Sequence, residues 1–259
     1  MSIIALLLTA YLIAIVTAYL GIKLGLVDVP NARKNHSGII PLTGGISIFI
    51  AIVLGEALFG IPPYTTEMMV IAAVIFLVGV FDDFRHINPV WRLAIQYGAG
   101  VLLATYGGIA IHNVGNLLAM GDIPLLFMTI PLTALSVAGL SNAYNMIDGI
   151  DGLAASTIAL PLLCLYILAT KAGHPNAPFL LLMLAPLTVF LIFNLGPNNR
   201  ALPKVFLGDG GSVTLGFLVT ASLVYFSQGD YAVIEPVTAL WLVTVPLMDM
   251  LATMLRRYR

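Results

Sequence analysis

The sequence predicts an all-α, polytopic membrane protein built as a bundle of about nine transmembrane helices. The chain is 60 % hydrophobic and only 9 % charged, its mean hydropathy is +1.03, and long apolar segments alternate with short polar ones. Soluble domains hold about 45–50 % apolar and about 25 % charged residues. A soluble enzyme is therefore excluded. A net charge of −1 leaves no basic surface for nucleic acid, so nucleic-acid binding is not expected.

The expected spans follow from the thickness of a bilayer. A hydrocarbon core of about 30 Å takes about 20 apolar residues per helix. The first apolar stretch is too long for a secretory signal and lacks basic residues before it, so we interpret it as a span. The nine expected spans are residues 3–22, 45–60, 67–81, 90–106, 123–141, 152–170, 177–195, 212–227 and 235–255.

The basic residues predict how the spans are oriented. If the amino terminus is outside, ten of the eleven Lys and Arg residues fall on the cytoplasmic side and only Lys171 falls outside. Cytoplasmic loops carry such an excess of positive charge. We therefore expect the amino terminus outside and the carboxyl terminus in the cytoplasm. The residues expected inside are Lys23, Arg33, Lys34, Arg85, Arg92, Arg200, Lys204, Arg256, Arg257 and Arg259.

Four polar clusters occupy the predicted cytoplasmic connections, and loops on a rigid scaffold commonly carry function. In the first cluster, Arg33, Lys34 and His36 precede Gly44 and Gly45 at a helix start. Basic side chains and backbone N–H groups at a helix start bind phosphate. These five residues are therefore candidate contacts for an anionic group. The alternative is an ordinary basic loop with a Pro/Gly turn.

The second cluster is the pair Asp82 and Asp83 at the cytoplasmic end of an apolar span. Adjacent carboxylates repel each other, and they are tolerated at a membrane edge when a cation neutralises them. Neighbours on a helix point about 100° apart. We therefore expect one of them to face a metal while the other does different work. The alternative is a solvated helix end that pairs with Arg85.

The third cluster, residues 142–152, interrupts an apolar pattern with two carboxamides, two carboxylates and two glycines. Asp148 and Asp151 stand three positions apart and can share one face. The Asp-Gly pairs break the helix and let the backbone approach a ligand. Hard oxygen ligands of this kind suit Mg²⁺ bound together with substrate phosphates. A simple turn would explain the glycines but not Asn142 and Asn145.

The fourth cluster lies at the start of another predicted span. Gly208 and Asp209 belong to a Gly-Asp-Gly-Gly sequence that can hold a metal or a phosphate at a helix start. Asn194 lies before it at an inner helix end, and Phe206 can stack on a planar ring. The alternative is a flexible Gly-rich turn.

In this order, the clusters resemble the polyprenyl-phosphate N-acetylhexosamine-1-phosphate transferases. The likeness is strongest to the bacterial group that transfers N-acetylglucosamine-1-phosphate to undecaprenyl phosphate, and it extends from Gly25 to Arg257. It rests on five motifs, Pro41–Ile46, Phe81–Asp83, Asn142–Leu153, Val205–Ser212 and Pro246–Met250.

The resemblance implies a reaction in which UDP-N-acetylglucosamine and undecaprenyl phosphate give the lipid-diphosphate sugar and UMP, with Mg²⁺ or substituting Mn²⁺. This would start the synthesis of O-antigen, common antigen or another cell-envelope polysaccharide on the cytoplasmic face of the bacterial inner membrane. A homodimer is an additional candidate state. Transferases for another UDP-N-acetylhexosamine or for UDP-MurNAc-pentapeptide are the related alternatives. A membrane transporter is the alternative of another class, although transporters usually place ionisable groups near the midplane.

The resemblance also implies roles for individual residues. The implied catalytic residues are Asp82, Asp83, Asp148 and Asp151, and the implied metal ligands are Asp209 and Asp83. Contacts to nucleotide and diphosphate are implied for Asn145, Asn194, Phe206 and Gly208. The candidates for contacting the lipid phosphate or the diphosphate are Arg33, Lys34, His36, Gly44 and Gly45.

We expect residues 1–259 to form one integral-membrane domain. The family pattern continues beyond Arg257 into a histidine-rich cytoplasmic loop and two further spans. On that basis the 259-residue polypeptide is expected to insert with the same topology but to turn over slowly or not at all.

Overall fold

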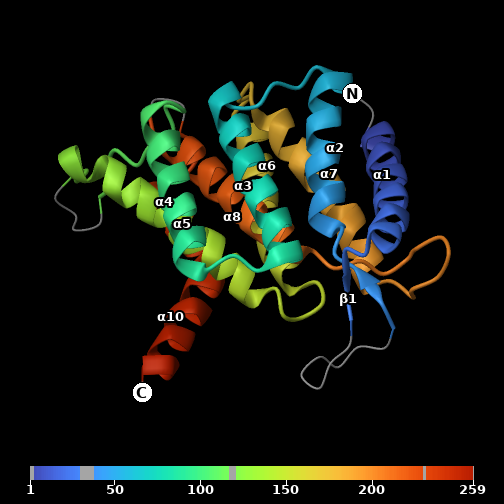
Figure 1. The fold of residues 1–259 in the computed structure, drawn as a ribbon. Helices are drawn as coiled ribbons and strands as arrows, with labels where there is room; N and C mark the ends of the chain where they lie inside the picture. The colour runs from blue at the N-terminus through green and yellow to red at the C-terminus, as the bar shows by residue number, and fades with distance from the viewer. Residues whose placement is uncertain (1–2, 30–37, 117–120, 230–231, 259) are drawn as a thin grey trace.

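The computed structural model describes residues 3–29, 38–116, 121–229 and 232–258, and most of these residues lie in helices (Figure 1). The candidate contacts Arg33, Lys34 and His36 lie outside the described residues. Two short strands, β1 (Val27–Asp28) and β2 (Ile40–Pro41), pair antiparallel. The helices are α1 (Ile3–Leu24), α2 (Gly44–Phe59), α3 (Thr66–Arg85), α4 (Pro89–Thr105), η1 (Leu126–Met128), α5 (Thr129–Ile147), α6 (Leu153–Lys171), α7 (Ala177–Leu195), α8 (Gly208–Ser227), α9 (Pro236–Leu242) and α10 (Thr244–Tyr258).

All nine predicted spans overlap helices of the structure. Five helical segments are long and apolar enough to cross a membrane, namely α1, η1 with α5, α6, α7 and α8. The bent pair α9 and α10 makes a sixth if it counts as one span. The prediction of an all-helical, polytopic membrane bundle is therefore confirmed. Nine crossings and the placement of the two termini stay predictions.

Capping residues explain where individual helices begin. The side chain of Thr65 accepts a hydrogen bond from the N–H of Met68 at the start of α3. At the start of α4, Asn88 accepts from the N–H of Val90, and Pro89 occupies the first turn. Such caps satisfy N–H groups that have no partner within the helix, and proline needs none there.

The last predicted span, residues 235–255, differs from expectation because it is broken. Helices α9 and α10 meet at Val243 and are bent by 65°. Pro246, near the start of α10, has no N–H to donate to the carbonyl of Leu242. A continuous helix would need that hydrogen bond, so the proline favours a break at this point.

Helix α8 lies at the centre of the bundle, where it packs against α2, α3, α5 and α6, and it is buried along almost its whole length. Small residues let neighbouring helix backbones approach closely. A Cβ atom on Gly45 of α2 would overlap the Cα of Gly211 in α8. Gly45 of the first cluster and Gly211 of the fourth therefore let two helices pack closely, a role that needs no ligand.

The four connections that carry the polar clusters meet at one end of the bundle. Figure 1 shows β1 and the connections from α3 to α4, α5 to α6 and α7 to α8 at the bottom. The N–H of Phe206 donates to the carbonyl of Pro41 at 2.9 Å, and the N–H of Gly44 donates to the carbonyl of Phe206 at 2.8 Å. These bonds join the start of α2 to the segment that precedes α8.

The close approach of α2 and α8 leads to a test of packing. We expect Gly45→Ala to destabilise the protein by about 1–3 kcal/mol, because the added methyl group pushes two backbones apart. The matched control is Gly98→Ala in α4, where a Cβ meets no atom within 4 Å. It should leave stability unchanged or raise it by up to about 1 kcal/mol. Thermal unfolding in detergent measures both, and an unaltered Gly45→Ala protein would contradict the packing argument.

Candidate active site

The carboxylate of Asp83, in the last turn of α3, caps the amino end of α8. Its Oδ1 accepts the N–H of Asp209 at 2.8 Å, and its Oδ2 accepts the N–H of Gly210 at 3.1 Å. N–H groups at a helix start lack partners within the helix, and the helix dipole favours negative charge there. Gly208 has a φ of 75°, and a Cβ on it would lie 2.8 Å from Oδ2 of Asp83. Only glycine suits this position.

Arg92, in the first turns of α4, joins residues of three other helices. Its Nη1 donates to Oδ2 of Asp82 at 2.5 Å and to Oδ2 of Asp209 at 3.0 Å, and its Nη2 donates to Oδ1 of Asn145 at 3.1 Å. Asp82 therefore pairs with Arg92 rather than with Arg85. From the sequence alone, Arg92 is expected only to be one of the cytoplasmic basic residues. The short connection at residues 86–88 could have revealed it, because short loops make helices antiparallel neighbours.

Asn145, predicted to contact nucleotide or diphosphate, links α5 to α8. Its Nδ2 donates to Oδ1 of Asp209 at 2.7 Å and to Oγ of Ser212 at 2.9 Å. One turn earlier, the side chain of Asn142 donates to Oε1 of Gln96 in α4. Because these polar groups find partners inside the bundle, α5 continues six residues beyond the span predicted at residues 123–141.

The connection from α7 to α8 is tied to the connection from α5 to α6. The buried side chain of Asn194 donates to the carbonyl of Val205 at 2.9 Å and accepts the N–H of Gly152 at 2.7 Å. Nearby, Nζ of Lys204 pairs with Oδ2 of Asp151 at 2.5 Å. The predicted residues Asn194 and Asp151 are thus brought to the same end of the bundle.

Asp148 follows the last residue of α5 and is partly buried. Burial, together with the negative charges of Asp209, Asp83 and Asp151, raises the pKa of Asp148 to about 8. The neutral, protonated form of this carboxyl group is therefore favoured near neutral pH. Strongly perturbed carboxyl groups of this kind cluster at functional sites.

The first-cluster glycines have packing roles in this structure. The N–H of Gly45 donates to the carbonyl of Leu207 at 2.9 Å, as that of Gly44 does to Phe206. A Cβ on Gly44 would overlap the ring of Phe190. Both amides are therefore engaged within the protein. The partly exposed ring of Phe206 lies 5.8 Å from Nζ of Lys204, and its stacking on a base stays a prediction.

The acidic residues could hold a divalent cation together with a phosphate. Within the described parts of the chain, no three acidic, His or Cys side chains by themselves form a metal centre. Oxygens of Asp82, Asp209 and Asn145 nevertheless converge on one positive group, the guanidinium of Arg92. Mg²⁺ prefers oxygen ligands and commonly takes one or two carboxylates plus substrate phosphates. These residues fit that mode of binding.

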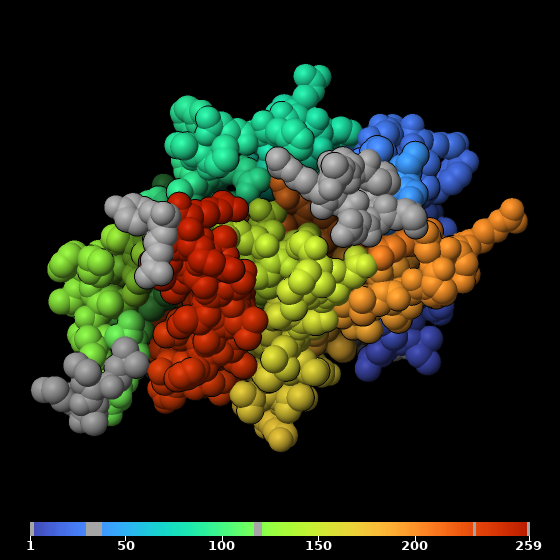
Figure 2. All heavy atoms as spheres, turned by 90° about the horizontal axis from the view of Figure 1, so that it is seen from below, coloured from blue at the N-terminus to red at the C-terminus, as the bar shows by residue number. Residues whose placement is uncertain are grey.

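The acidic site is recessed in the end face of the bundle. Figure 2 shows this face from below, with the orange start of α8 lying deeper than the teal α3–α4 connection and the yellow-green α5–α6 connection. The side chain of Asp209 is 36 % exposed, whereas that of Asp82 is 3 % exposed. A ligand from solution would therefore reach Asp209 before Asp82.

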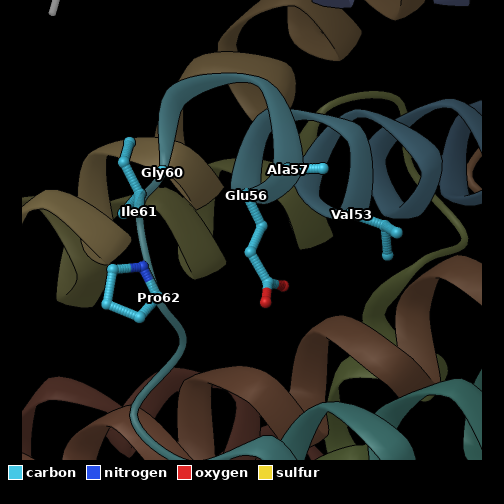
Figure 3. A pocket seen from close by; sticks show the side chains of 6 residues that line it. All are labelled: Val53, Glu56, Ala57, Gly60, Ile61 and Pro62. Carbon is cyan, nitrogen blue, oxygen red and sulfur yellow. The ribbon is translucent and has the colours of Figure 1, made fainter.

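A pocket of about 570 Å³ lies at the carboxyl end of α2, away from the acidic site (Figure 3). Glu56 points into it and, among the residues that the structure describes, is the only ionisable one in its lining. None of the predicted site residues lies there. Its lining residues are Val53, Glu56, Ala57, Gly60, Ile61 and Pro62.

Comparison with known proteins agrees with this geometry. The sequence model described as Glycosyl transferase family 4 matches residues 65–227, from the start of α3 to the end of α8. A protein of Escherichia coli (strain K12) named undecaprenyl-phosphate alpha-N-acetylglucosaminyl 1-phosphate transferase is 36 % identical over 242 residues, which are 92 % of this chain and 65 % of that protein. The protein of Yersinia pestis with the same name is 35 % identical over 240 residues, 92 % of this chain and 66 % of that protein.

A relative from Bacillus subtilis extends the match over nearly the whole chain. The probable undecaprenyl-phosphate N-acetylglucosaminyl 1-phosphate transferase of Bacillus subtilis (strain 168) is 33 % identical over 258 residues, 97 % of this chain and 69 % of that protein. The chain spans about two thirds of the length of the curated relatives it matches.

The fold and the site thus define a class, a polytopic membrane helix bundle with a cluster of aspartates at one end. Within that class, the chain belongs to glycosyl transferase family 4. The matched range contains Asp82, Asp83, Asp148, Asp151 and Asp209. The family resemblance inferred from the five sequence motifs is confirmed.

The position of Asp83 leads to a test of its capping role. We expect Asp83→Asn to lower stability by about 1–2 kcal/mol, because the amide keeps one acceptor oxygen but loses the charge at the α8 amino end. The control Asp122→Asn removes an exposed charge that lies outside the helices, and it should have no effect. Thermal unfolding compares the two variants. Equal unfolding temperatures would contradict the cap.

Proposed function

We propose that the protein transfers N-acetylglucosamine-1-phosphate from UDP-N-acetylglucosamine to undecaprenyl phosphate and releases UMP. The observation that carries the proposal is the meeting of Asp82, Asp83 and Asp209 around the start of α8, inside the range that matches the family. The names of the relatives give the lipid acceptor and the transferred N-acetylglucosamine-1-phosphate, and the family resemblance implies the UDP-linked donor. The product would start a cell-envelope polysaccharide such as O-antigen or common antigen.

The proposed setting is the bacterial inner membrane, with the acidic site on its cytoplasmic face. Nine crossings, with the amino terminus outside and the carboxyl terminus inside, follow from the distribution of basic residues. The gathering of the four polar connections at one end of the bundle supports this arrangement. Undecaprenyl phosphate would then enter from the inner leaflet and the nucleotide sugar from the cytoplasm.

The chemistry is phosphoryl transfer, in which catalysis is mostly positioning and charge stabilisation. A phosphate monoester is largely ionised near neutral pH, because its second pKa is about 6. The lipid phosphate therefore needs no strong base, and we favour its direct, in-line attack on the sugar-linked phosphorus. A covalent aspartyl intermediate is the alternative. Arg92 and Lys204 place positive charge beside the carboxylates and would help to orient the phosphates.

Mg²⁺ is the proposed cofactor, with Mn²⁺ as a substitute, and Asp209 and Asn145 are the residues that would hold it, while Asp82 stays paired with Arg92. When bound there together with the diphosphate, the ion supplies neutralisation of the charge on the departing UMP. Asp83 is engaged by two N–H groups of α8. Its proposed part is therefore to position Asp209.

UMP release from membranes containing the protein tests the proposed function. We expect UMP only when UDP-N-acetylglucosamine and undecaprenyl phosphate are both present. Asp209→Asn should lower the rate by about 10³ or more, because it removes a charge-stabilising contact. The controls Glu67→Gln and Asp122→Asn lie outside the cluster and should retain the rate. Release of UMP only with another UDP-sugar would show that the donor differs from the one proposed. No release with any UDP-sugar would overturn the proposal.

Removal of divalent cations tests the proposed cofactor. Membranes stripped with EDTA should lose UMP release and regain it on addition of Mg²⁺ or Mn²⁺, because the site offers hard oxygen donors. The control adds EDTA already saturated with Mg²⁺. Undiminished turnover in EDTA alone would rule out the cation requirement.

A further inference from the structure

The guanidinium of Arg92 occupies the point where acceptor oxygens from three helices converge. It reaches Asp82 in α3, Asp209 in α8 and Asn145 in α5. Both oxygens of the Asp209 carboxylate are engaged, since Oδ1 accepts from Asn145 and Oδ2 accepts from Arg92. A cation that binds Asp209 through Oδ2 would lie next to the guanidinium of Arg92, and the two positive charges would repel each other.

The two ion pairs of Arg92 differ in how tightly they hold. The pair with Asp82 measures 2.5 Å and involves a carboxylate that is 3 % exposed and that also accepts the N–H of Ile87. The pair with Asp209 measures 3.0 Å and involves a carboxylate that is 36 % exposed. Solvent screens the second pair more strongly, so it is the one that yields to a competing cation.

We propose that Arg92 is the internal counter-ion of the acidic site, and that a divalent cation displaces its guanidinium from Asp209 while the pair with Asp82 persists. Arg92 is thus a positioning residue. It keeps Asp82 and Asp209 together when no cation is bound, and it opposes cation binding in the absence of substrate. The inference deepens the proposed function, because the cation is the one proposed for the reaction.

The proposal predicts in which direction loss of Arg92 changes the affinity for a cation. Without Arg92, Asp82 and Asp209 face each other as like charges, which destabilises the site until a cation neutralises them. Loss of Arg92 should therefore strengthen cation binding and, at the same time, make the fold depend on the cation. If Arg92 only supported the fold, its loss would weaken cation binding and lower stability together, and the cation would not restore the stability.

The test is Mn²⁺ binding to the purified protein in detergent, measured by electron paramagnetic resonance of free Mn²⁺ without nucleotide or lipid phosphate. We expect Arg92→Met to lower the Kd for Mn²⁺ by about tenfold or more, as expected when one opposing charge is removed nearby. Its unfolding temperature should fall in EDTA and recover with Mn²⁺. The control Arg85→Met removes a basic residue that is exposed and has no ion pair within the described chain. Its Kd for Mn²⁺ and its unfolding temperature should equal those of the unsubstituted protein.

Arg92→Lys provides a second variant in case Arg92→Met does not fold. An ammonium group keeps the charge but lacks the planar fork that reaches two carboxylates and an amide at once, so we expect an intermediate Kd. A Kd that is unchanged or weaker in both variants would overturn the proposal, and so would an unfolding temperature that Mn²⁺ does not restore. The readout contains no substrate, so its failure is separate from a failure of UMP release.

Discussion

A helix that begins inside a protein must find acceptors for its first N–H groups, and α8 finds them on the carboxylate of Asp83. Asp83 belongs to α3, so this contact fixes the start of α8 against a different helix. Gly208 makes the contact possible, because a side chain there would collide with the carboxylate. Asp209 is thereby placed next to Arg92 and Asn145. The pairing of Asp209 with Arg92 and Asn145 therefore depends on where α8 begins.

The same end of the bundle must balance many negative charges in a setting of low polarity. Burying an unpaired charge is costly, and the carboxylates at this end are neutralised in two ways, by ion pairs and by protonation. Arg92 pairs with Asp82 and Asp209, and Lys204 pairs with Asp151. Asp148 instead has a raised pKa and favours the protonated form. The balance depends on two basic residues, and a bound phosphate or cation would change it.

Structural and functional roles coincide in this site. Asn194 holds two connections together through backbone groups, and Asn145 holds Asp209. The glycines at the start of α2 bring that helix against α8. A substitution at any of these positions would alter stability as well as activity, so both measurements are needed to interpret it. Arg92 differs, because its loss should affect stability and cation affinity in opposite directions.

The sequence by itself determined that the chain is a polytopic helical membrane protein, that its polar clusters meet at one end, and that it belongs to its family. Those conclusions depend on composition, on segment length and on the order of local motifs, which are properties of neighbouring residues. The partner of Asp82 could not be assigned in this way, and neither could the extent of α5 beyond Asn142. The tertiary structure decided that Asp83 caps α8, that Gly44 and Gly45 pack rather than present free amides, and that Arg92 joins three helices. The physical reason is that these contacts connect residues far apart in the sequence, 127 positions in the case of Asp83 and Gly210. Their geometry follows from how closely α2, α3, α4, α5 and α8 pack, which no local pattern specifies.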